Sequence, residues 1–195
     1  MPEVLPGSLR SALADLTNWL NAAQIPSMVI GGVAASILGR PRLTQDIDAL
    51  AILQESDWRR AIDGAVRFGI FPRIADALEF AQRSRVLLMR HAQSAINLDI
   101  TFGGLPFEES AVESSQLHDV GGIHVKLPRV EDLLVMKAIA RRPKDLEDIR
   151  GLLSAHPRAD IAAARRWIRE FSIATGMSDM LLEFDRLVEQ RRPKS

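Results

Sequence analysis

The stretch that decides the fold is residues 28–52, MVIGGVAASILGRPRLTQDIDALAI. It holds a diglycine, Gly31-Gly32, after one apolar run and an acidic pair, Asp46 and Asp48, inside a second apolar run. Side chains two residues apart in a strand point to the same face, so the two carboxylates should lie together while Ile47 turns into the core. The pattern therefore predicts a strand, a glycine turn with a short helix, and a second strand that presents two acids.

A third carboxylate follows in the stretch Asn97-Leu98-Asp99-Ile100, where apolar neighbours predict another strand. Three converging carboxylates carry more negative charge than a fold tolerates without a cation, and hard oxygen ligands suit Mg²⁺ or Mn²⁺. We therefore predict that Asp46, Asp48 and Asp99 are the catalytic residues and the metal ligands. With a diglycine turn upstream, this set indicates metal-assisted phosphoryl chemistry on a nucleotide.

The composition fits a globular protein and excludes several kinds of site. With 195 residues, 47% of them hydrophobic, the chain has the size of one α/β domain or of a domain with a helical extension. Its 25 basic and 25 acidic residues cancel, so bulk charge does not indicate a nucleic-acid partner. The absence of cysteine excludes disulfides, thiolate zinc sites and thiol nucleophiles. The N-terminal sequence lacks a signal-peptide pattern and no apolar run is long enough to span a membrane, so we expect a cytoplasmic protein.

The hydrophobic periodicity predicts alternating helices and strands up to Pro128 and helices after it. Ser8 is the expected N-cap of the first helix. The expected helices are 8–23, 33–38, 57–68, 74–83, 130–140, 145–155, 161–171 and 177–190. The expected strands are 27–30, 44–52, 86–89 and 95–102, with a hairpin of 116–119 and 123–127. This predicts an α/β (α+β) fold with an α/β lobe at 1–128 and a helical lobe at 129–195.

The diglycine, the Asp-Ile-Asp strand and the later Asp99 resemble the signature of the nucleotidyltransferase superfamily, which has the polymerase-beta-like fold. Within it, the chain resembles the AbiEii-type toxin nucleotidyltransferases and related uncharacterised bacterial proteins. That group carries a lysine near the start of its helical half, then a basic residue followed by Asp-x-x-Asp, which here are Lys137 and the stretch Lys144-Asp145-Leu146-Glu147-Asp148. The resemblance covers about residues 28–155 and implies a mixed sheet with flanking helices and a C-terminal helical lobe.

The resemblance implies transfer of a nucleotidyl group from a nucleoside triphosphate to a hydroxyl, with Mg²⁺ or Mn²⁺ as cofactor. The residues expected to bind the nucleotide are Gly31, Gly32, Arg42, Thr44, Lys137, Lys144 and Asp148. Many family members have serine where this chain has Gly32, so only backbone N–H groups would hold a phosphate there. The active site is expected between the two lobes, with Asp145 and Asp148 orienting the lysines or a ribose hydroxyl. The implied acceptor is an RNA 3′ end such as tRNA, or a protein hydroxyl, and the implied partner is a cognate antitoxin.

Two other functions remain open from the sequence. The first is transfer to a small hydroxylated molecule such as an aminoglycoside, for which Glu108, Glu109 and Glu113 offer negative charge. The second is a weakly catalytic nucleotide-binding or protein-interaction module, which the departure at Gly32 favours and the intact carboxylate set opposes.

Each candidate residue also has a structural alternative. Asp-x-Asp pairs are often solvated, and Asp99 could be a salt-bridged strand end. Lys137 could extend its ammonium to water from an otherwise apolar helix face. Lys144 and Asp148 could form a surface ion pair four residues apart, worth only about 0.3–0.5 kcal/mol. The four histidines form no metal-binding pattern, and no serine-histidine-acid set follows from their spacing.

Overall fold

The computed structural model describes residues 5–190, which form two compact units. The first unit comprises residues 5–33 and 43–128, and the second comprises residues 34–42 and 129–190. Residues 34–42 therefore belong to the helical second unit. The predicted lobes, divided at residue 128, place this segment in the α/β lobe instead. Within the described residues, no helix is both long and apolar enough to cross a membrane.

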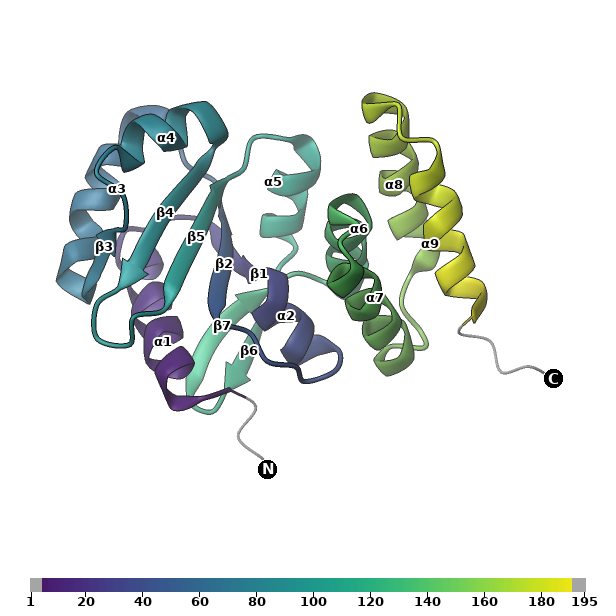
Figure 1. Ribbon diagram of the computed structural model, residues 1–195, viewed down its shortest axis with the longest axis horizontal. Coiled ribbons are helices and arrows are strands. Elements are labelled where there is room, and N and C mark those ends of the chain that lie inside the picture. The colour runs from purple at the N-terminus through teal and green to yellow at the C-terminus, as the bar shows by residue number, and fades with distance from the viewer. Residues whose placement is uncertain (1–4, 191–195) are drawn as a thin grey trace. The chain divides into compact units, whose positions relative to one another are not determined.

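The first unit is built on a mixed five-stranded sheet with the order β1-β2-β5-β4-β3 (Figure 1). Its strands in that order are β1 (Ser27–Ile30), β2 (Asp46–Ala51), β5 (Asn97–Phe102), β4 (Val86–His91) and β3 (Ile70–Pro72). Strands β2 and β5 are parallel, and the other neighbours are antiparallel. The predicted mixed α/β fold is therefore confirmed.

One face of this sheet is apolar and packs against helices α1 (Gly7–Ala22) and α3 (Trp58–Ala65). The Trp58 ring stacks on Phe102 of β5 with 4.1 Å between ring centroids. Trp19 of α1 donates its indole N–H to the Ala61 carbonyl oxygen of α3 at 3.1 Å. Strand alternation buries Ile47 completely on this face, so its neighbours Asp46 and Asp48 lie half-buried on the opposite face, as predicted.

The remaining elements of the first unit pack against individual strands of the sheet. A hairpin of β6 (Gln116–Val120) and β7 (Ile123–Leu127) turns at Gly121-Gly122, as predicted, and β7 packs near β1 and α1. Helix α4 (Ala77–Ser84) packs on β4, and α5 (Pro106–Glu113) packs near β2.

Several details of the first unit differ from the sequence-based expectation. The diglycine is not a turn that precedes a helix, because α2 (Gly31–Leu38) begins at Gly31 itself. Pro6 rather than Ser8 is the N-cap residue of α1. The helix expected at 57–68 is divided into a 3-10 turn, α3 and a second 3-10 turn. Strand β3 and helix α5 were not predicted, since both are short and contain proline.

The helices of the second unit are α6 (Val130–Ala140), α7 (Pro143–Ala155), α8 (Ile161–Thr175) and α9 (Asp179–Gln190). The sequence predicts all four, α6 with the same bounds and each of the others with one end shifted. The end of α2 approaches α7 closely, because a Cβ atom on Gly39 would lie 3.3 Å from the Leu152 nitrogen. Arg141 ends α6 in the left-handed conformation and forms ion pairs with Asp179 and Glu183 of α9.

Candidate functional site

The predicted catalytic acids occupy neighbouring positions on the polar face of the sheet. Asp48 on β2 is the register partner of Ile30 on β1 and of Asp99 on β5. Asp46, one pleat earlier, is the register partner of Asn97. Neighbouring strands lie about 4.8 Å apart, so the parallel pairing places the backbones of Asp48 and Asp99 side by side. The sequence prediction that a third acid joins the pair from an adjacent strand agrees with this register.

Gly31 is required at its position for two reasons. Its φ of +66° lies in the left-handed region, where residues with a Cβ atom are strained. In addition, a Cβ atom at this position would lie 1.9 Å from Asp48 Oδ2 and 2.6 Å from Asp48 Cγ. The Asp48 carboxylate therefore occupies the space that any side chain at residue 31 would need. The glycine fixes where this carboxylate sits, in addition to the role in phosphate binding that the sequence predicts.

Replacing Gly31 with alanine is expected to displace the Asp48 carboxylate and to destabilise the first unit by about 1–3 kcal/mol. Gly69→Ala is the matched control, because Gly69 has a φ of +68° but its nearest contact, with His91, is an ordinary 3.9 Å. Urea unfolding of both variants separates backbone strain from the clash with Asp48. Equal losses in the two variants would show that the contact with Asp48 contributes nothing.

Asp46 is oriented by a local contact with Thr44. The Thr44 hydroxyl lies 3.2 Å from Asp46 Oδ1 and 3.3 Å from the Asp46 carbonyl oxygen, so it can donate to either acceptor. Thr44 therefore holds the carboxylate of Asp46, a predicted catalytic residue, and a contact of Thr44 with a phosphate stays a prediction.

Asp99 is paired with an arginine that the sequence did not single out. Arg73 Nη1 lies 2.9 Å from Asp99 Oδ1, and the two side chains are 24% and 31% exposed. The contact has ion-pair distance but lacks hydrogen-bond alignment, since Asp99 Oδ1 is buried and accepts no hydrogen bond. The salt-bridge alternative for Asp99 is therefore present in the structure. Arg73 was missed because it follows β3, a strand that was itself not predicted.

The carboxylates fit a metal ion that substrate helps to bind, rather than a complete protein cage. Within residues 5–190, no group of three or more acidic or histidine side chains is close enough together to hold a metal ion. Mg²⁺ is commonly bound by one or two carboxylates together with waters and substrate phosphates. Asp46 and Asp48 supply two carboxylates on one strand face, and the third, Asp99, has Arg73 as its cation.

The second unit contains a buried network of charged side chains. Lys137 Nζ lies 3.0 Å from Asp145 Oδ1 and 2.7 Å from Asp148 Oδ2. Arg42 donates from Nε and Nη2 to the two Asp148 oxygens at 2.7 and 3.1 Å, and Arg142 Nε donates to Asp145 at 2.6 Å. The Lys137, Asp145 and Asp148 side chains are at most 4% exposed. These contacts join the segment after α2 to helices α6 and α7.

This network decides between the structural alternatives for the lysines. The alternative in which the Lys137 ammonium extends to water is wrong, because the ammonium is buried between Asp145 and Asp148. The alternative in which Lys144 and Asp148 form a surface ion pair is also wrong, because Asp148 pairs with Lys137 and Arg42. Lys144 is exposed, and none of the residues in the described part of the chain pairs with its ammonium. Nucleotide binding by Arg42, Lys137, Lys144 and Asp148 stays a prediction.

The network makes stability depend on pH through Asp145. Burial alone would raise the pKa of this carboxyl, but hydrogen bonds from Arg142 and Lys137 outweigh burial and lower the pKa below its usual value. A carboxyl whose pKa is lower in the folded state than in the unfolded state stabilises the fold. This stabilisation is fully present at pH values above the unfolded-state pKa of about 4, and it is lost as the pH falls through the folded-state pKa.

We therefore expect Asp145→Asn to be less stable than the parent chain at pH 7, with a difference that shrinks as the pH falls below about 4. Urea unfolding at a series of pH values measures this difference. Glu147→Gln is the control, since the Glu147 side chain on the same helix is 71% exposed and pairs with Arg150 at the surface. A pH-independent difference for Asp145→Asn would contradict the expectation.

A serine-histidine-acid set, which the spacing did not predict, does occur on the apolar face of the sheet. His91 Nε2 lies 2.9 Å from Asp15 Oδ2 and His91 Nδ1 lies 2.7 Å from Ser94 Oγ. The imidazole is only 2% exposed and links α1 to the turn after β4. This arrangement fixes the turn against the core, because both ring nitrogens are engaged inside the fold.

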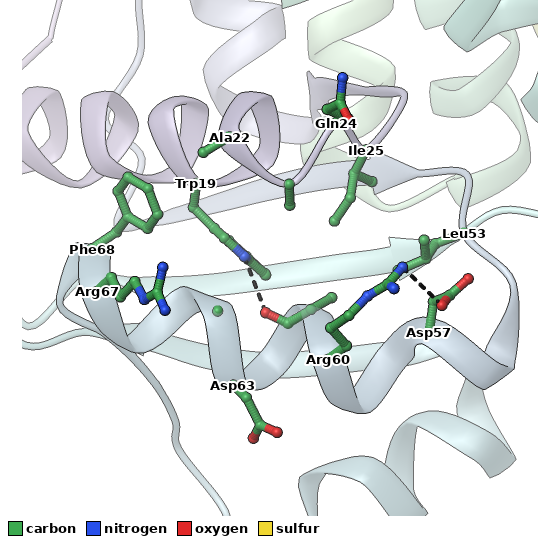
Figure 2. Close-up of a pocket in the computed structure, with 13 residues that line it drawn as sticks. Trp19, Ala22, Gln24, Ile25, Leu53, Asp57, Arg60, Asp63, Arg67 and Phe68 are labelled. Atoms are coloured by element: carbon green, nitrogen blue, oxygen red, sulfur yellow. Dashed lines mark hydrogen bonds and ion pairs between the residues drawn. The ribbon is translucent and has the colours of Figure 1, made fainter.

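Two further features lie apart from the acidic residues within the first unit. A cavity of about 640 Å³ is formed by α1, α3 and the segments that follow them, with the Asp57–Arg60 ion pair at its rim (Figure 2). None of the predicted site residues lines it.

Glu108, one candidate for binding a cationic acceptor, instead accepts hydrogen bonds from the N–H groups of Gly104 and Leu105 and caps α5.

Comparisons with known proteins give a family from one family model and support for the fold from one solved structure. The family model "Nucleotidyl transferase AbiEii toxin, Type IV TA system" matches residues 27–192. Among solved structures, the antibiotic-resistance factor ANT(2'')-Ia is similar with a TM-score of 0.58 at 12% identity, over 89% of this chain and 97% of that chain, which supports the fold alone. A nucleotidyltransferase-like antigen from Paracoccidioides brasiliensis is 15% identical over 89% of this chain and 92% of its own, with a TM-score of only 0.45. No curated protein sequence matches the chain.

Proposed function

The chain belongs to the AbiEii nucleotidyl transferase family, and we propose that it transfers a nucleotidyl group from a nucleoside triphosphate to a hydroxyl acceptor, with Asp46 and Asp48 as its catalytic carboxylates. The observation that carries this proposal is the position of Asp48, whose carboxylate lies against Gly31 at the start of α2 and beside Asp99 on the next strand. Paired acids beside a helix start are suited to bind a metal ion and a phosphate at one place.

In the proposed reaction, the acceptor hydroxyl oxygen forms a bond to the α-phosphorus. The bond from that phosphorus to the oxygen bridging the β-phosphate breaks, and pyrophosphate leaves with the electron pair. Asp46 and Asp48 would hold Mg²⁺ or Mn²⁺, which stabilises the charge that develops on the phosphate oxygens. Asp99, the register partner of Asp48, is the proposed third carboxylate of the site and the group proposed to take the hydroxyl proton.

The remaining predicted residues would position the nucleotide. The backbone N–H groups of Gly31 and Gly32 belong to the first turn of α2, and such groups bind anions at helix starts. Lys144 offers an exposed ammonium to the β- and γ-phosphates. Arg42, Lys137 and Asp148 are proposed to act as one network that fixes the start of α7.

The proposed acceptor is an RNA 3′ end such as tRNA, or a protein hydroxyl, and the proposed partner is a cognate antitoxin, because the family description names a toxin of a toxin–antitoxin system. A cytoplasmic location is part of this proposal, since nucleoside triphosphates are found there. Transfer to an aminoglycoside-like molecule receives less support, because Glu108 is occupied as a helix cap.

A label-transfer assay tests the proposal. The protein is incubated with each α-phosphate-labelled nucleoside triphosphate, Mg²⁺ or Mn²⁺, total tRNA and cell protein. Label in RNA or protein that is absent with an Asp46→Ala, Asp48→Ala variant supports the proposal and identifies the acceptor class. Nucleotide binding without transfer in any mixture contradicts it and favours a small-molecule acceptor or a binding module.

A further inference from the structure

The carboxylate of Asp99 has a buried oxygen that requires a nearby cation. Its Oδ1 atom is shielded from solvent and accepts no hydrogen bond, although it lies 2.9 Å from Arg73 Nη1. Burying a charged oxygen is costly unless a cation or a hydrogen-bond donor compensates it. Asp48, also negative, is the neighbour of Asp99 in the parallel register, which adds to this requirement.

The backbone around Arg73 fixes its position relative to Asp99. The Arg73 amide donates to the Leu88 carbonyl oxygen of β4 at 3.1 Å, and Leu88 is the register partner of Asp99. Arg73 therefore reaches across one strand, from the end of β3 to β5. This places a guanidinium on the same polar sheet face as the catalytic acids.

The contact between Arg73 and Asp99 is weaker in geometry than a structural arginine pair in the same protein. Arg42 makes two aligned hydrogen bonds to Asp148, at 2.7 and 3.1 Å. Arg73 approaches Asp99 at ion-pair distance without an aligned hydrogen bond. Aligned, charge-assisted and bidentate contacts are the strong ones, so the Arg73 contact is the more easily exchanged of the two.

We infer that Arg73 competes with a divalent metal ion for the Asp99 carboxylate. The inference rests on the proposed function, since it takes Asp99 as a member of the metal site. Arg73 is then a positioning residue that supplies the positive charge at Asp99 when no metal is bound. Removing the guanidinium frees Asp99 to join Asp46 and Asp48 as a third oxygen ligand.

Mn²⁺ binding without nucleotide, measured by the loss of the free-ion electron paramagnetic resonance signal, tests the inference independently of turnover. Arg73→Gln is expected to bind Mn²⁺ about tenfold more tightly than the parent chain, because a half-buried competing charge is removed. Without the Asp99 carboxylate the gain in Mn²⁺ affinity is expected to vanish. The Arg73→Gln, Asp99→Asn double variant should therefore bind Mn²⁺ as tightly as Asp99→Asn alone. Circular dichroism confirms that each variant is folded.

Arg90→Gln is the matched control for the general change in charge. Arg90 is an exposed residue of β4 opposite Asn97, on the same sheet face, and none of the residues that the structure describes pairs with its side chain. Its replacement is expected to change the Mn²⁺ affinity less than about twofold, because solvent and salt screen an exposed charge.

The outcomes separate this inference from the proposed function. Unchanged Mn²⁺ affinity in Arg73→Gln, an equal gain in Arg90→Gln, or a gain that persists without the Asp99 carboxylate overturns the inference. Any of these results together with label transfer by the parent chain leaves the proposed function standing. If Arg73→Gln binds Mn²⁺ more tightly as expected but the parent chain transfers no label, the competition is supported and only the proposed function is overturned.

Discussion

Asp48→Asn is expected to reduce nucleotidyl transfer by about 10³-fold or more, while leaving the fold intact. Asparagine has the shape of aspartate, so it still fills the space beside Gly31, where a Cβ atom would lie 1.9 Å from Asp48 Oδ2. The substitution removes the negative charge and a proposed metal ligand. Asp99 cannot replace either of them while its carboxylate is paired with Arg73. Label transfer at saturating nucleotide measures the effect.

Two comparisons make the result for Asp48→Asn specific. Asp63→Asn removes one exposed carboxylate from α3 and is expected to retain the activity of the parent chain. Urea unfolding of Asp48→Asn is expected to match that of the parent chain within about 0.5–1 kcal/mol, because volume and packing are conserved. Transfer by Asp48→Asn within tenfold of the parent rate would remove this residue from the catalytic set.

The acidic pair was predictable from sequence because strand alternation is a local property. Ile47 is fully buried and Asp46 and Asp48 face the other way, as a period of two requires. The apolar neighbours of Asp99 predicted a strand and the shared charge predicted that it joins the pair, but the parallel pairing that sets it opposite Asp48 depends on strand order, which local sequence does not give. Three of the four C-terminal helices, α7, α8 and α9, were also predictable because apolar residues recur along them at helical spacing.

Arg73 was not predictable because its role depends on a long-range pairing. It lies 26 residues before Asp99 in the sequence and reaches it only through the order β3-β4-β5. Strand β3 has three residues and ends in Pro72, so neither length nor alternation indicated it. Gly31 shows a related limit, since its φ was foreseeable from the diglycine but its contact with Asp48 required the antiparallel pairing of β1 and β2.

Lys137 shows why the sequence left its role open. A lysine on an apolar helix face either extends to water or finds buried acids, and both alternatives have the same local pattern. The choice depends on the turn between α6 and α7, where Arg141 takes a positive φ and α7 returns Asp145 and Asp148 to the ammonium. Burial places this lysine in a structural network, which the sequence offered neither as the expected nucleotide-binding role nor as the surface alternative.

Lys137→Met is accordingly expected to lower the free energy of unfolding by about 3–5 kcal/mol, because it leaves buried carboxylates without one of their cations. Asp145 and Asp148 keep Arg142 and Arg42, yet their side chains remain at most 4% exposed and cannot recover the lost charge from water. Urea unfolding followed by circular dichroism measures the change.

Lys144→Met is the matched control for Lys137→Met. It removes the same ammonium group from an exposed position at the start of α7, the helix that carries Asp145 and Asp148. It is expected to change the free energy of unfolding by less than about 0.5 kcal/mol. If Lys144 contacts the β- and γ-phosphates as proposed, the KM for the nucleoside triphosphate rises in this variant without a loss of stability. A Lys137→Met variant as stable as Lys144→Met would contradict the structural role, because a buried ammonium between two carboxylates cannot be removed without cost if it holds them in place.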